Sequence, residues 1–202
     1  MNQKEEANRL KACENLSAEG RKHFKFIEFD ENEVLVTEIR KHPLGLFAII
    51  LTGFIVAALA VAFASFIAVA DLNKVFEVSD AGGLKSALLA FSFIALVLTL
   101  IGTLIGVFLY RSNVIYVTSE KIAQVLYTSL FNRKISQLSI GDVQDVTVTQ
   151  KGILAHIFNY GVLVIETAGE QQNYTFTFVP DPYMRSKDIV GAHERNLTLF
   201  GN

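Results

Sequence analysis

The stretch LGLFAIILTGFIVAALAVAFASFIAVA, at residues 44–70, contains no Asp, Glu, Lys or Arg. A second stretch of this kind, SALLAFSFIALVLTLIGTLIGVFLY, follows at residues 86–110. About 20 helical residues are enough to cross the hydrocarbon core of a bilayer, and both stretches are longer than that. The sequence therefore predicts two transmembrane helices that form a hairpin in the lipid bilayer, joined by a polar outer loop at residues 71–85.

The orientation of this hairpin follows from the basic residues near its ends. Arg40 and Lys41 precede the first helix, and Arg111 follows the second. The loop at residues 71–85 holds two lysines against three acidic residues. Because basic segments stay on the cytoplasmic side, the sequence predicts a multi-pass protein of the cell membrane with both termini in the cytoplasm.

Neither apolar stretch contains an ionisable residue, which argues against a pump or a transporter built from this chain alone. Both stretches carry small residues at three- and four-residue spacing, which allows helices to pack closely. The candidate packing positions are Gly53, Ala57, Ala60 and Ala64 in the first stretch and Gly102 and Gly106 in the second. These positions favour contact within one hairpin, and the alternative is self-association or contact with another protein.

After the hairpin, residues 111–192 show the period of two that is typical of half-buried strands. Tyr174, Phe176 and Phe178 alternate with threonines, and further β-rich runs are separated by short turns. A helix should close this segment, with Asp181 as its N-cap and Pro182 in its first turn. Gly191 weakens that helix, so we expect it to end there and residues 193–202 to form a C-terminal tail.

A further strand is expected before the hairpin. The segment EVLVTEIR, at residues 33–40, lies within a candidate first barrel strand at residues 29–43. Since both termini are predicted on one side of the membrane, this strand can reach the later ones. The hypothesis is a mainly-β cytoplasmic domain, a split seven-strand antiparallel barrel with a C-terminal helix, preceded by a polar N-terminal tail at residues 1–28.

Several motifs occur in a characteristic order around the hairpin. They are EVLVTEIRKHP at residues 33–43, NVIYVTS at 113–119, IGDVQDVTVTQ at 140–150 and FVPDP at 178–182. This order resembles the bacterial pleckstrin-homology-like (membrane-flanked domain) family of two-span membrane proteins. The resemblance implies a pleckstrin-homology-like (PH-like) β-barrel at the cytoplasmic face of the inner membrane, and it supplies no catalytic residues.

The residues themselves contain no pattern of an enzyme, a metal site or a cofactor site. The four histidines are scattered, and the single cysteine, Cys13, excludes a disulfide within the chain. With 18 basic and 20 acidic residues the net charge is −2, so nucleic acid is not an expected partner. We therefore predict no catalytic residues, no cofactor and no bound metal.

Binding at the membrane face remains as the predicted function. The favoured prediction is a non-enzymatic, membrane-anchored adaptor or accessory subunit that offers a strand edge to a protein partner. The alternative is a sensor of membrane stress or a binder of anionic lipid headgroups. Four basic side chains in or beside turns are the candidates for contact with a headgroup: Lys121, Arg133, Lys134 and Lys151.

Overall fold

The computed structural model describes residues 3–72, 82–167 and 174–200. The chain divides into two compact units. One unit contains Leu46–Phe108, and the other combines Met1–Gly45 with Leu109–Asn202. The middle of the predicted outer loop, residues 73–81, lies outside the described residues.

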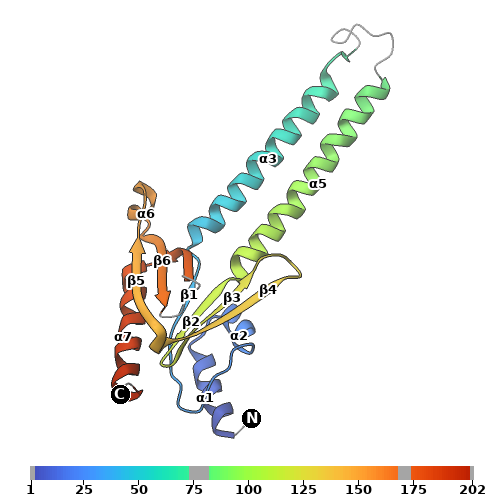
Figure 1. Cartoon of the computed structure of the whole chain (residues 1–202). Helices are drawn as coiled ribbons and strands as arrows, with labels where there is room; N and C mark the ends of the chain where they lie inside the picture. The colour runs from blue at the N-terminus through green and yellow to red at the C-terminus, as the bar shows by residue number, and fades with distance from the viewer. Residues whose placement is uncertain (1–2, 73–81, 168–173, 201–202) are drawn as a thin grey trace. The chain divides into compact units, whose positions relative to one another are not determined.

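The apolar unit consists of two long helices, α3 (Pro43–Val69) and α5 (Gly82–Ser112). Their most apolar windows have mean hydropathies of 2.8 and 2.6, and each helix is long enough to cross a membrane. Figure 1 shows the two helices running side by side, as a hairpin requires. Length and composition thus support the predicted spans, although α5 begins four residues earlier than the apolar stretch that predicted it.

Four strands of the other unit form an antiparallel sheet in the order β1 (Leu35–Arg40), β2 (Val114–Thr118), β3 (Lys121–Tyr127) and β4 (Arg133–Ser139). The strand predicted before the hairpin is β1, and it pairs with the first strand after the hairpin. Glu38 lies opposite Tyr116 and Arg40 opposite Val114. The sheet is therefore assembled from both sides of the apolar unit in the sequence.

The remaining strands form a second sheet in the order β5 (Val143–Thr149), β6 (Tyr160–Thr167) and β7 (Tyr174–Pro180). The short helices η1 (Ile140–Asp142) and α6 (Ile153–Ile157) precede and follow β5, and α7 (Pro182–Phe200) closes the chain. Because the described strands pair within two separate sheets, the predicted barrel is open rather than closed. The side chains between the two sheets and α7 form one core, which includes Ile39, Val117, Leu163, Ile165, Phe176, Val179 and Ile189.

The C-terminal helix is longer than the sequence predicted. It begins at Pro182 as expected, but it continues past Gly191 to Phe200, so residues 193–200 are helical rather than a tail. Two hydrogen bonds to other parts of the chain hold the second half of α7. The ring nitrogen Nδ1 of His193 lies 2.7 Å from the Ile140 carbonyl oxygen, and the Asn196 side-chain amide donates to the Ser119 carbonyl at 3.0 Å. A glycine inside a helix costs only about 1 kcal/mol, which such contacts can offset.

The prediction of a polar tail at residues 1–28 is wrong, because most of this segment is helical and packs on the first sheet. This segment forms α1 (Gln3–Glu14) and α2 (Ala18–Phe24), and the Ser17 hydroxyl caps α2 by accepting the Gly20 amide at 2.9 Å. Both helices cover the face of β2 and β3 that points away from the second sheet. Their contact forms a second core of Ala12, Leu16, Phe24, Ile27 and Phe29 with Val114, Tyr116, Ala123 and Val125. Every residue of β2 is consequently buried.

Candidate functional site

One end of the β unit, here called the rim, is where the chain leaves for α3 and returns from α5. His42 stands directly before α3, and its backbone N–H donates to the Phe178 carbonyl at 2.6 Å. The Tyr110 hydroxyl, from the last turn of α5, donates to the His42 carbonyl at 2.7 Å. These bonds join the segment that follows β1 to β7 and to the last turn of α5.

Aromatic rings surround this junction. The rings of Tyr160 and Phe178 stack with centroids 5.3 Å apart, and the His42 ring lies 5.4 Å from Tyr160. Phe178 has a φ of 57°, which places a bulky residue in the left-handed region at a bulge between β6 and β7. Such backbone strain costs on the order of 1–3 kcal/mol and is concentrated at functional sites. The strained backbone and the aromatic rings therefore make the rim a candidate ligand site.

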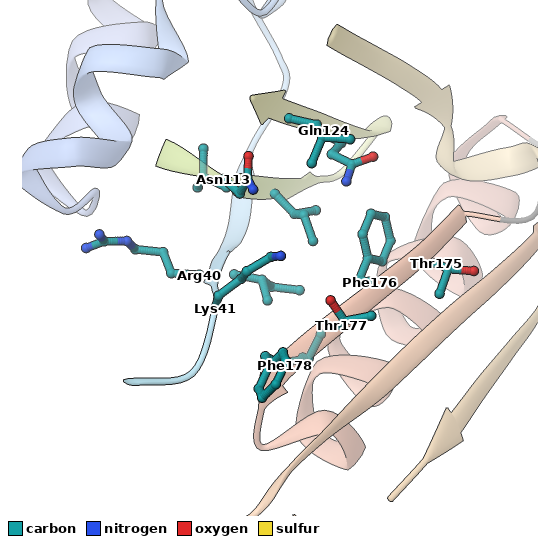
Figure 2. Close-up of a pocket in the computed structure, with 13 residues that line it drawn as sticks. Arg40, Lys41, Asn113, Gln124, Thr175, Phe176, Thr177 and Phe178 are labelled. Atoms are coloured by element: carbon teal, nitrogen blue, oxygen red, sulfur yellow. The ribbon is translucent and has the colours of Figure 1, made fainter. Parts of the chain in front are cut away.

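A pocket of about 130 Å³ opens at the rim between the ends of β1, β2, β3 and β7. It is lined by Ile39, Arg40, Lys41, Asn113, Val114, Ile115, Gln124, Leu126, Thr175, Phe176, Thr177, Phe178 and Val179. In Figure 2 the Lys41 side chain extends toward β7, whereas Arg40 extends to the opposite side. The lining is largely aliphatic and aromatic. Its polar groups include the Lys41 ammonium, the side-chain amides of Asn113 and Gln124, and the hydroxyls of Thr175 and Thr177.

The two cations of this pocket have different partners. Arg40 forms an ion pair with Glu19, whose other carboxylate oxygen lies 2.8 Å from the guanidinium of Arg111. Lys41 lies over the Tyr110 ring, 5.3 Å from its centroid, and no ion pair joins it to an acidic residue of the part of the chain that the structure describes. Burial lowers the pKa of Lys41, because desolvation disfavours its charged form. An anion in the pocket would relieve that cost.

A second polar cluster lies at the other end of the sheet, and its side chains bond to one another. The buried Glu33 carboxylate accepts a hydrogen bond from the Thr118 hydroxyl at 2.5 Å and lies 3.1 Å from the Lys121 ammonium. The carboxylates of Asp30, Glu33 and Glu120 lie within 4.8 Å of one another. Burial and the charges of Glu33 and Asp30 raise the pKa of Glu120. The Lys121 ammonium forms ion pairs with Asp30 and Glu33, so this cluster has a structural role in holding β3 to the segment before β1.

A family model described as the bacterial PH domain matches residues 32–186, which is more than half of the chain. The chain belongs to this family. The match begins just before β1 and ends in the first turns of α7, so the bacterial PH domain includes strands from both sides of the apolar hairpin.

One solved structure is also similar to this bacterial PH domain, the crystal structure of a DUF1696 family protein with a pleckstrin-homology domain from Shewanella loihica PV-4. The two proteins are 14% identical with a TM-score of 0.32, and the similarity covers 40% of this chain and 70% of the other. The comparison with curated proteins gives no match.

The four predicted headgroup residues do not form one cluster in the PH domain. Lys121 begins β3 beside Glu33 and lies opposite Ser139, whereas Arg133 lies opposite Tyr127 at the other end of that strand pair. A strand of this length spans about 20 Å, so Lys121 is not part of the rim. Hydrogen bonds and the charges of Glu33 and Asp30 raise the Lys121 pKa, against the effect of burial.

The other three predicted basic residues lie at the rim, in two different loops. Arg133 and Lys134 begin β4 after the β3–β4 turn, and Lys151 lies between β5 and α6. The Arg133 guanidinium packs 3.7 Å from the centre of the Phe26 ring. Sequence reasoning missed Lys41 as a pocket residue and used it only to orient the hairpin. Its position directly before a span was the one signal available.

The predicted packing residues divide between two environments within the apolar unit. Gly53, Ala57, Ala60, Ala64 and Gly106 are half-buried, whereas Gly102 is exposed. A Cβ added at Gly106 would lie 3.2 Å from a methyl group of Ile49, and one added at Gly53 would collide with Thr103. A Cβ at Gly102 would meet no described atom within 4 Å. Gly102 lines an open groove together with α3 residues such as Gly53 and Val56, so this position has room for contact with lipid or another chain.

Proposed function

We propose that this protein is a non-enzymatic, membrane-anchored binding module that takes an anionic headgroup, or a free anion of the same phosphate chemistry, in the rim pocket. The observation that carries the proposal is Lys41, a half-buried cation in a pocket and without an acidic partner among the described residues. An unpaired charge removed from water is costly, so a site that keeps one favours a ligand of opposite charge.

The position of Lys41 in the chain supports a headgroup as the source of that anion. Lys41 lies three residues before Leu44, the first residue of the apolar stretch. Three residues of extended chain reach at most about 10 Å. If α3 spans a bilayer, the Lys41 ammonium lies at the depth of the lipid phosphates, where a lysine is favourable.

The experiment is native mass spectrometry of the full-length protein in a neutral detergent, titrated with phosphatidylglycerol. The proposal predicts a tightly bound lipid whose occupancy falls about tenfold in Lys41→Gln. A matched control is Lys11→Gln, which removes an exposed lysine from α1, away from the rim, and should leave that occupancy unchanged. Glycerol phosphate and inorganic phosphate are titrated in parallel to separate a soluble anion from a lipid. Equal occupancy in the wild type and Lys41→Gln would refute the proposal.

A second candidate is the adaptor function, and the sheet topology is what favours it. Among the described strands, β5 pairs only with β6, so its other edge faces no described strand, and α7 packs beside β5. An extended peptide can add to such an edge. A photoreactive residue at Thr147, an exposed position on β5, should crosslink one protein in cells, while the same residue at exposed Val34 should not. Equal crosslinking at both positions would contradict this function.

A further inference from the structure

Two loops at the rim expose large apolar side chains to an unusual degree. In and beside α6, the exposed fractions are 79% for Ile153, 56% for Leu154, 68% for Ile157 and 46% for Phe158. In the β3–β4 turn they are 42% for Leu130 and 98% for Phe131. The larger side chains of α6 point outward and only Ala155 is buried, which reverses the pattern of a helix that packs on its own domain. Exposed apolar clusters of this kind mark interaction surfaces.

The α6 loop is placed at the rim by its neighbours. It ends at Asn159, whose carbonyl accepts the Asp181 N–H at 2.9 Å, and the next residue, Tyr160, contacts His42. His42 is the residue before α3, so α6 lies at the end of the β unit from which the chain enters the apolar helices. Gly152, at a φ of 91°, makes the turn that begins α6. Figure 1 shows α6 beyond the tip of β5.

The β3–β4 turn is placed at the same end by a second set of contacts. Asn113 directly follows α5, and its side-chain oxygen accepts the backbone N–H of Tyr127, the last residue of β3, at 2.7 Å. Phe131 therefore lies in a turn that begins next to the point where the chain returns from α5. The two exposed apolar loops and both connections to the apolar helices share one rim.

The charges of the two loops fit the same surface. Residues 128–134 and 150–160 contain no Asp or Glu, and they carry Arg133, Lys134 and Lys151. The acidic cluster of Asp30, Glu33 and Glu120 lies at the opposite end of the sheet. Apolar and aromatic side chains flanked by basic ones are the composition of segments that lie in the membrane interface.

We propose that the β3–β4 turn and α6 insert into the headgroup region of the leaflet that α3 and α5 enter, so that the β unit rests on the lipid bilayer through its rim. Phe131 and Ile157 are the deepest side chains, and the neighbouring lysines and arginine face the lipid phosphates. This contact does not require a ligand in the Lys41 pocket, because it depends on apolar side chains outside that pocket.

The test measures depth at single labelled positions of the full-length protein. Cys13, the single cysteine, is replaced in Cys13→Ser, and an environment-sensitive fluorophore is attached at Phe131→Cys, Ile157→Cys or Val34→Cys. Val34 is the matched control, because it is 61% exposed and its N–H bonds to Ser119 in the β2–β3 turn, away from the rim. The proteins are reconstituted into phosphatidylcholine vesicles with or without bromine atoms on the acyl chains.

The proposal predicts blue-shifted emission at positions 131 and 157 and at least twofold quenching by the brominated lipid, with neither effect at position 34. Emission typical of water at 131 and 157 would overturn it. A blue shift without quenching would also overturn it, because the label would then be covered by protein rather than lipid. Neutral vesicles keep this result separate from the Lys41 pocket, whose failure to bind phosphatidylglycerol would leave the quenching unchanged.

Discussion

Removing the Phe24 side chain should unfold the β unit far more easily, because this residue joins the N-terminal helices to the first sheet. Phe24 has no exposed surface, and its ring lies 5.1 Å from Phe29 and 5.3 Å from Tyr116. The Arg9 guanidinium covers the ring at 5.5 Å and donates to the Phe24 carbonyl at 2.7 Å. Phe24→Ala would therefore leave a cavity between Phe29, Tyr116 and Arg9.

The size of the effect follows from comparable substitutions. Truncating a buried phenylalanine to alanine costs about 3–5 kcal/mol. Urea lowers the free energy of unfolding of small domains by about 1–3 kcal/mol per molar. A loss of about 4 kcal/mol at a slope of about 2 kcal/mol per molar shifts the urea midpoint down by about 2 M. Domains of this kind have only about 5–15 kcal/mol of stability, so the variant should be close to unfolding.

The assay is urea titration of the full-length protein in a non-ionic detergent, followed by tyrosine fluorescence. The chain contains six tyrosines and no tryptophan, and Tyr116 lies against the substituted ring. Val34→Ala is the control, because Val34 is 61% exposed and lies away from the rim, and its truncation should change stability by less than about 0.5 kcal/mol. Equal midpoints for the two variants would refute the packing of α1 and α2 on the sheet.

Two further outcomes follow from single positions. Gly102→Leu should leave the α3–α5 hairpin intact and disrupt any complex formed through that helix face, whereas Gly106→Leu should disturb the hairpin itself at Ile49. Thermal unfolding in detergent measures the stability of the hairpin, and size-exclusion chromatography in detergent measures the complex. A destabilised hairpin in Gly102→Leu together with an intact one in Gly106→Leu would contradict this packing. Burial and the nearby charges of Arg133, Lys22 and Lys25 lower the pKa of His23 below 6.5, so the folded state favours neutral His23. The stability from neutral His23 is then full above about pH 6.5, the pKa of the unfolded state, and is lost as the pH falls below it towards the lowered pKa of the folded state. The urea midpoint should therefore drop less between pH 7.5 and 5.5 in His23→Gln than in the wild type, and identical drops would contradict the assigned role.

The hairpin and the split sheet could be predicted because each depends on a local pattern. Uncharged apolar runs of more than 20 residues have few alternatives to membrane helices. The alternation in residues 33–40 and the predicted topology together brought β1 to β2, and the observed register of Glu38 against Tyr116 confirms that pairing. The end of α7 was missed because the bonds that hold its second half come from Ile140 and Ser119, far away in the sequence.

The N-terminal helices were missed because their apolar residues are few and widely spaced. One signal was nevertheless present in the sequence: β2 is apolar at four successive positions, from Val114 to Val117. A strand that is apolar on both faces must be covered on both faces. The second sheet and α7 cover one face, so a further element had to cover the other.

The candidate site was only partly predictable for a related reason. The sequence identified basic turns, and three of the four residues lie at the rim. It could not foresee that Glu33 neutralises Lys121, because the two are separated by the whole hairpin in the chain. The pocket beside Lys41 likewise depends on the end of β7 reaching the end of β1, a contact between distant segments.

The most direct test of the split domain is hydrogen–deuterium exchange of the full-length protein in detergent, read by mass spectrometry on peptides of β1 and β2. If β1 is part of the domain, amides of Leu35–Arg40 that pair with β2 should exchange as slowly as those of Val114–Thr118. Exchange in both strands should then require the whole domain to unfold. Exchange of all β1 amides at the rate of an unstructured peptide, while β2 stays protected, would contradict the assembly of one PH domain from both sides of the hairpin.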